Sequence, residues 1–156
     1  MAIAKMLKQY LQERAVAFDT VPHPRTQSSM KTAEAAHVPG DRLAKAVILE
    51  DSQGYLMMVV PSTHHLDLGA IHQLLGRRLG LATETELAKL FPDTDVGAIP
   101  PVGEPYDLEV VLDESLVDQS EVYFEAGDHA ELIRVSGEEF QKLLGQARRG
   151  CFSHHV

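Results

Sequence analysis

The sequence predicts an α/β protein of the α+β type, in which helices pack around a mixed, largely antiparallel sheet. Two apolar segments of strand length, 44–49 and 55–61, flank a short turn that contains Gly54. Three further strand-like segments follow, at 108–112, 121–125 and 132–135, and segments of helical periodicity lie before and after them. The 156 residues and the hydrophobic content of 44% suit a single domain, 1–156, with one core.

The first part of the chain predicts a helix, a strand and a second helix. The helix extends from Ile3 to Ala15, and its apolar residues form one stripe. A short strand over 17–21 ends at Pro22-His23-Pro24, because prolines lack the N–H donor that regular structure needs. The second helix begins around Ser28 and ends near Val38-Pro39-Gly40.

The hairpin that follows carries a lysine in an apolar strand. Lys45 is the one polar residue between Ala44 and Leu49. Alternation places its side chain on the side of Val47 and Leu49, and both faces of the strand are expected to be covered. Two interpretations are open: a strand-end lysine whose amine extends to water, or a cation held at a pocket for an anion.

The second half of the chain predicts two short helices before its strands and one after them. A helix from Gly69 to Leu75 stops at Gly76, and a helix from Thr83 to Leu90 starts with the capping-box pair Thr83 and Glu86. A last helix over 138–144 begins at Ser136. Residues 146–156 are expected to form a flexible tail.

An unusual loop, Gly97-Ala98-Ile99-Pro100-Pro101-Val102-Gly103, precedes the strand at 108–112. Two glycines and two adjacent prolines give a stiff backbone whose carbonyls cannot all join a sheet. Such a loop can present fixed carbonyls and amides to a ligand, or it can be a rigid connector.

Charge and composition exclude several classes of function. The net charge of −9 argues against a broad basic face for DNA or for a membrane surface. No apolar run reaches membrane-spanning length and no signal peptide is evident, so a cytoplasmic protein is expected. The single cysteine, Cys151, excludes an internal disulfide and suits a reducing compartment.

No metal ion and no other cofactor is expected. His64 and His65 are adjacent, so on an extended backbone their side chains point to opposite faces. Cys151, His154 and His155 lie in the last six residues, where disorder is the default. The sequence also contains no P-loop, no dinucleotide-binding glycine pattern and no nucleophile elbow.

Five segments together resemble a known family. They are AKAVILED at 44–51, VVPSTHHLDL at 59–68, GAIPPVG at 97–103, VVLDESL at 110–116 and YFEAGDH at 123–129. In order and spacing from Val21 to Leu144 they resemble the YbaK/prolyl-tRNA synthetase-associated domain, a family of free-standing and appended aminoacyl-tRNA deacylases. The resemblance implies a hydrolase that serves translation fidelity by cleaving the ester of a mischarged aminoacyl-tRNA.

The resemblance also implies roles for particular residues. Lys45 would contact the terminal phosphate region of the tRNA acceptor end, and Gly97 would belong with it to the catalytic set. The rest of the Gly-x-x-x-Pro loop and His129 would bind substrate, His129 by orienting substrate or water. Apart from the resemblance, His23 is expected to line the pocket because its segment precedes the helix near Lys45. The expected substrate-binding residues are Ala98, Ile99, Pro100, Pro101, His129 and His23. A solvent-facing turn residue remains an alternative for His129, and an ordinary loop residue for His23.

Substrate and partners follow from size and charge. Apolar residues near the expected pocket, Ala46, Val47, Met57 and Ile99, favour a small amino acid on the tRNA. The acidic turn after Tyr123 and the net negative charge predict weak intrinsic affinity for tRNA, so delivery by a synthetase or an elongation factor is expected. A non-catalytic module that binds aminoacyl-tRNA or a small aminoacyl ligand is the alternative function.

Overall fold

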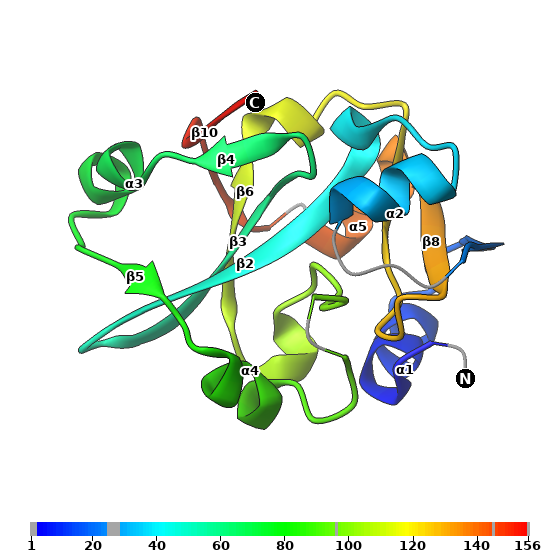
Figure 1. The fold of residues 1–156 in the computed structure, drawn as a ribbon, viewed down its shortest axis with the longest axis horizontal. Helices are drawn as coiled ribbons and strands as arrows, with labels where there is room; N and C mark the ends of the chain where they lie inside the picture. The colour runs from blue at the N-terminus through cyan, green and yellow to red at the C-terminus, as the bar shows by residue number, and fades with distance from the viewer. Residues whose placement is uncertain (1–2, 25–28, 96, 145, 156) are drawn as a thin grey trace.

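The computed structural model describes residues 3–24, 29–95, 97–144 and 146–155 (Figure 1). The predicted fold class is confirmed: within the described chain, an eight-stranded mixed sheet is covered by helices on both faces. The helices are α1 (Lys5–Glu13), α2 (Ser29–Ala35), α3 (Leu68–Leu75), α4 (Glu84–Leu90) and α5 (Gly137–Leu144), with 3-10 turns η1 (Gly40–Arg42), η2 (Glu104–Tyr106) and η3 (Glu114–Leu116).

The strand order of the main sheet is β1-β8-β7-β2-β3-β6-β9, with β5 paired to β2. The pairs β7–β2, β3–β6 and β6–β9 are parallel, and the remaining pairs are antiparallel. The strands are β1 (Asp19–Pro22), β2 (Leu43–Asp51), β3 (Gly54–Pro61), β4 (His64–Leu66), β5 (Gly80–Leu81), β6 (Glu109–Asp113), β7 (Glu121–Glu125), β8 (Glu131–Ser136), β9 (Arg148–Gly150) and β10 (Ser153–His155).

Both faces of the sheet are buried, as the unbroken apolar runs predict. The main core packs α1, α4 and α5 against one face, through residues such as Ala44, Phe124 and Phe140. The opposite face carries two smaller groups. The α3 cluster comprises Leu49, Leu56, Met58, Val60, Ile71, Val111 and Phe152. The α2 cluster comprises Ala33, Val38, Leu43, Tyr123 and Leu132.

The predicted hairpin is confirmed, with Ala44 opposite Pro61 and Asp51 opposite Gly54. The predicted helix after Gly69 is confirmed in α3, where Asp67 is the N-cap and Gly76 ends the helix. The helix start expected at Ser28 lies outside the described residues. That helix ends at Ala35, before Val38, because His37 already has a left-handed φ of 58°.

The capping box at the start of α4 is also confirmed. The Thr83 hydroxyl accepts a hydrogen bond from the Glu86 N–H at 3.2 Å, and a Glu86 carboxylate oxygen accepts one from the Thr83 N–H at 3.0 Å. These contacts satisfy backbone donors that a helix start otherwise leaves open.

Thr83→Ala is therefore expected to lower the free energy of unfolding by about 1 kcal/mol. Urea titration of the variant measures this change. Thr85→Ala is the matched control, because Thr85 is exposed inside the same first turn and alanine is the better helix former. An equal loss in both variants would show that the cap itself contributes nothing.

The prediction of a flexible tail over 146–156 is wrong for its strand-forming part. β9 pairs with β6, and β10 pairs with β4. Between them Phe152 is fully buried in the α3 cluster. The Phe152 N–H and the Ser153 hydroxyl donate to Asp113 at 3.2 and 2.8 Å, and the Asp67 N–H donates to the Phe152 carbonyl at 2.7 Å. Burial of a large aromatic ring outweighs the tendency of a chain end to fray.

Candidate functional site

Lys45 lies inside β2, opposite Val60 of β3. Its strand neighbours confirm the predicted alternation, because Val47 packs with the α3 cluster whereas Ala46 packs with the main core. Leu43, on the side of Lys45, belongs to the α2 cluster. Lys45 is therefore half-buried on the face that α2 and α3 cover, between their two apolar clusters.

This setting favours the anion-site interpretation of Lys45 over a free strand-end lysine. Burial lowers the pKa of its ammonium. Within the described chain, no side chain forms a hydrogen bond or an ion pair with its Nζ atom. A half-buried cation without a protein partner is suited to an anionic group brought by a ligand.

The end of β7 lies beside Lys45. β2 and β7 run parallel, with Leu43 level with Tyr123 and Ala44 level with Phe124. One step further in the same register places Lys45 beside Glu125, and alternation puts both side chains on the face of Leu43 and Tyr123. The turn after β7 therefore begins next to the lysine.

That turn, residues 126–130, is fixed from several sides. The Asp128 carboxylate accepts hydrogen bonds from the Ala130 and Glu131 N–H groups at 3.0 and 3.2 Å. Gly127 has a φ of 113°, and a Cβ there would lie 2.8 Å from the Cβ of Ala4 in the chain before α1. Only glycine fits this position without displacing the N-terminal segment.

His129 is buried in this turn and does not face solvent. It is 6% exposed and has a left-handed φ of 58°. Its Nδ1 lies 3.1 Å from Oε2 of Glu125, which is also buried. The surface-turn alternative for His129 is therefore wrong.

His23 reaches the same carboxylate from the chain after β1. Its Nε2 lies 3.1 Å from Oε1 of Glu125, and its Nδ1 lies 2.8 Å from the carbonyl oxygen of Pro24. The His23 N–H donates to the Ala130 carbonyl at 2.9 Å, and its side chain is fully buried. His23 lies in a loop, as the alternative states, but its ring is enclosed beside the turn and does not face solvent.

Glu125 is the member of this group that the sequence did not single out. Burial raises its pKa to about 7, the negative Asp128 adds to the rise, and His129 acts against it. The sequence feature that could have identified Glu125 is its place between Phe124 and Ala126, where a carboxylate ends an apolar strand. Because Glu125 faces two histidines inside the protein, it does not present a negative charge to RNA.

The loop at 97–103 packs against the other face of the sheet. Ile99 and Val102 join the main core, and Ala98 is fully buried. Gly97 remains exposed with a φ of 85°, a conformation that favours glycine. Pro100 and Pro101 are buried, and the Pro100 carbonyl accepts from the Val102 N–H at 2.9 Å.

The turn connects this loop to the Lys45 side of the sheet. The Asp95 N–H donates to the Gly127 carbonyl at 2.7 Å, and the Ala98 N–H donates to the Asp95 carbonyl at 3.1 Å. A cavity of about 420 Å³ lies where the chain before the loop meets the turn. Its walls come from Pro92, Asp93, Thr94 and Asp95 on one side and Gly127, Asp128 and Ala130 on the other.

The comparison with protein families decides the assignment. The family described as the aminoacyl-tRNA editing domain matches residues 23–143, most of the chain and the whole region just described. The chain belongs to the aminoacyl-tRNA editing domain family.

Individual relatives support this family assignment. The chain is 29% identical over 111 residues to the prolyl-tRNA editing protein ProX of Acetoanaerobium sticklandii, with 67% of each chain covered. It superposes with a TM-score of 0.84 on a crystal structure described as a candidate trans-editing enzyme for prolyl-tRNA synthetase, at 27% identity over 97% of this chain and 96% of that one. A crystal structure of hypothetical protein APE2540 shares the fold, with a TM-score of 0.84 and 23% identity over 96% of this chain and 100% of that one.

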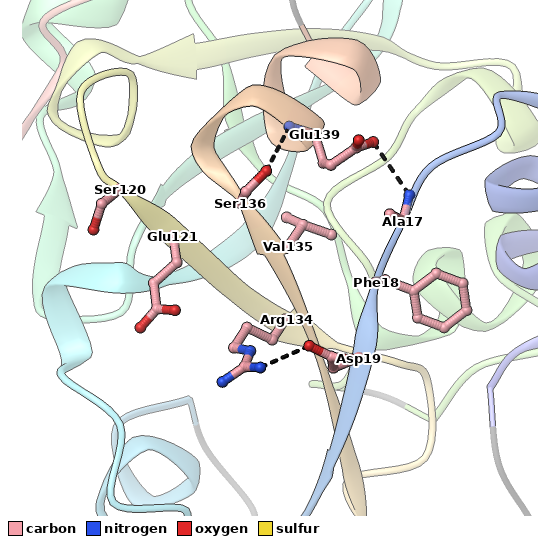
Figure 2. Close-up of a pocket in the computed structure, with 9 residues that line it drawn as sticks. All are labelled: Ala17, Phe18, Asp19, Ser120, Glu121, Arg134, Val135, Ser136 and Glu139. Carbon is pink, nitrogen blue, oxygen red and sulfur yellow. Dashed lines mark hydrogen bonds and ion pairs between the residues drawn. The ribbon is translucent and has the colours of Figure 1, made fainter.

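Another cavity, of about 490 Å³, lies away from the predicted site of the editing domain (Figure 2). It borders β1, β7, β8 and the start of α5, and none of the predicted site residues lines it. Arg134, the cation on its wall, is bound to Asp19 at 2.6 Å. Glu139 accepts from the Ala17 N–H at 3.2 Å. Because the only cation among its described lining residues is bound to Asp19 and the other charged residues on its wall, Glu121 and Glu139, are acidic, this cavity is a poor site for an anionic acceptor end.

The histidine pairs meet at the small sheet of the editing domain. His65 is opposite His154 and His64 is opposite His155, with ring centroids 6.4 and 5.6 Å apart. Cys151 is exposed, and its thiol donates to Glu114 at 3.2 Å. The described residues contain no group of three or more His, Cys, Asp or Glu that could hold a metal ion.

The four apolar residues expected around one small pocket do not share one. Ala46, Met57 and Ile99 pack in the main core, whereas Val47 packs on the opposite face with the α3 cluster. The expectation is wrong because neighbouring residues of a strand point to opposite sides.

No helix within the described part of the chain has the length and apolar character that a membrane crossing requires.

Proposed function

We propose that this editing domain is a deacylase that hydrolyses the ester of mischarged aminoacyl-tRNA carrying a small amino acid. The observation that supports it most is Lys45, a half-buried cation without a protein partner in the described chain, level with the buried group of His23, Glu125 and His129. The acceptor end of tRNA supplies the phosphate that such a cation would bind. The cytoplasm, where tRNA is charged, is the proposed location.

The chemistry needs few residues. An aminoacyl ester is already activated, and the neighbouring ribose hydroxyl can assist an attacking water. Holding the ester and the water in fixed positions therefore supplies most of the acceleration. In this proposal Lys45 holds the phosphate, and the loop from Gly97 to Pro101 offers fixed backbone groups to the aminoacyl moiety. His129 orients substrate or water, and His23 helps to hold the turn that carries His129.

Single-turnover deacylation of a panel of mischarged tRNAs tests the proposal. The panel carries alanine, serine, threonine or cysteine, with phenylalanine as the large control, and begins with tRNA for proline because one relative is named a prolyl-tRNA editing protein. Acceleration of at least one small ester above the protein-free rate, with phenylalanyl-tRNA unchanged, is expected. No acceleration across the panel would favour the non-catalytic binding module.

The binding of uncharged tRNA is expected to be weak at physiological salt. The net charge is −9, and few cations are available for the phosphate contacts that supply most of a protein's affinity for nucleic acid. Delivery by a synthetase or an elongation factor would then supply the missing affinity. A filter-binding titration measures this, with low salt as the positive control. A tight complex at physiological salt would contradict the need for a delivery partner.

A further inference from the structure

Glu125 is the centre of the buried group beside Lys45. One carboxylate oxygen lies 3.1 Å from His23 Nε2 and the other lies 3.1 Å from His129 Nδ1, and all three side chains are at most 8% exposed. We propose that Glu125 is a positioning residue of the editing reaction, which shares one proton with His23 and thereby fixes the His129 ring and its turn beside Lys45. This inference rests on the proposed deacylase function.

The hydrogen bonds of His23 require the shared proton. The Pro24 carbonyl oxygen can only accept, so His23 Nδ1 carries a hydrogen toward it. In a neutral ring Nε2 then presents a lone pair, and it faces a carboxylate oxygen that is also an acceptor. Two acceptors at 3.1 Å repel each other unless a proton lies between them. The pair therefore holds one proton, on either Nε2 or Oε1.

The second carboxylate oxygen positions His129. His129 Nδ1 lies at ion-pair distance, 3.1 Å, from Oε2 of Glu125, and this contact holds only while the carboxyl group keeps its place between the two rings. The His23 N–H bond to the Ala130 carbonyl ties the far side of the turn to the same assembly. Loss of the shared proton would separate His23 from Glu125 and release one of these constraints on His129.

The surroundings favour retention of the proton near neutral pH. Burial raises the pKa of Glu125 to about 7, with Asp128 acting in the same direction and His129 in the opposite one. Lys45 is the cation on the neighbouring strand, and α2, on the same face, carries exposed Lys31 and Glu34. A Glu125 carboxyl group with this raised pKa keeps its proton below about pH 7 and loses it as the pH rises through that value.

Glu125→Gln imitates the proton-sharing form permanently. The amide N–H can donate to His23 Nε2 while the amide oxygen takes the place of Oε2 beside His129 Nδ1. Glu125→Ala removes both contacts. Glu121→Gln is the matched control, because Glu121 begins the same strand and contacts Tyr123 and Arg42 instead.

The kinetic arm measures single-turnover deacylation of the best panel substrate at pH 6.0 and pH 8.5, corrected for spontaneous hydrolysis. Glu125→Gln is expected to match the wild type within about threefold at pH 6.0 and to exceed it by about tenfold at pH 8.5, where the wild type has lost the proton. Glu125→Ala is expected to lower kcat about 10- to 100-fold at both pH values with little change in KM. Glu121→Gln is expected to follow the wild type.

A second arm does not depend on catalysis. In urea unfolding at the same two pH values, the midpoint of the wild type is expected to fall relative to that of Glu125→Gln as the pH rises. If the midpoint falls in this way but no substrate is deacylated, the shared proton is supported and the proposed function is rejected. The inference would be overturned if neither the ratio of the wild-type and Glu125→Gln rate constants nor the difference between their urea midpoints changed with pH. A Glu125→Gln enzyme as slow as Glu125→Ala would overturn it as well.

Discussion

Replacing Lys45 with alanine is expected to slow single-turnover deacylation on the order of 100-fold, a loss of about 2 to 3 kcal/mol of transition-state stabilisation. The ammonium is half-buried between the α2 and α3 clusters, where an ionic hydrogen bond to phosphate is stronger than in water. No side chain among the described residues forms an ion pair or hydrogen bond with this ammonium, so its removal leaves no carboxylate unpaired. The fold should therefore survive the substitution.

The controls separate this role from a general charge effect. Lys89→Ala removes an exposed lysine from the last turn of α4, and its deacylation rate should stay within about twofold of the wild type. Lys45→Arg should recover part of the rate, since it keeps the charge but not the compact ammonium. If Lys45→Ala were as fast as Lys89→Ala, Lys45 would be an ordinary strand-end lysine with no role in the reaction.

Replacing Phe152 with alanine is expected to lower the free energy of unfolding by about 3 to 5 kcal/mol. The ring is fully buried in the α3 cluster, and its backbone connects β9 and β10 to Asp67 and Asp113. The substitution leaves a cavity beneath α3 and weakens the pairing of both terminal strands.

Urea unfolding measures this loss, and Cys151→Ala is the matched control. Cys151 is the preceding residue and is exposed, so its substitution should change stability by no more than about 0.5 kcal/mol. If Phe152→Ala were equally mild, the terminal strands would contribute nothing to the fold and the tail would be flexible, as the sequence predicts.

Local signals in the sequence predicted the elements that depend on neighbours in the chain. The β2–β3 hairpin follows from two apolar runs around Gly54, and α4 follows from the spacing of Thr83 and Glu86. The pairing of β10 with β4 depends on contacts between residues nearly ninety positions apart, such as His64 with Ser153. No periodicity within 146–156 reports such a contact, and the tail was therefore misjudged.

The candidate site was predicted in the same uneven way. Lys45 stands out because a charge interrupts an apolar strand, and the loop from Gly97 to Pro101 stands out by its glycines and prolines. Glu125 does not stand out, because it precedes an acidic turn and reads as surface. Its role depends on burial between His23 and His129, which come from opposite ends of the chain.

A double-mutant cycle tests most directly whether Lys45 and the buried group form one site. Single-turnover rate constants are measured for the wild type, Lys45→Ala, Glu125→Ala and the double variant on the substrate that the panel identifies. We expect the double variant to be about as slow as the slower single variant, because groups that act together on one ester are not additive. Losses that multiply fully, as for distant independent sites, would contradict a single editing site.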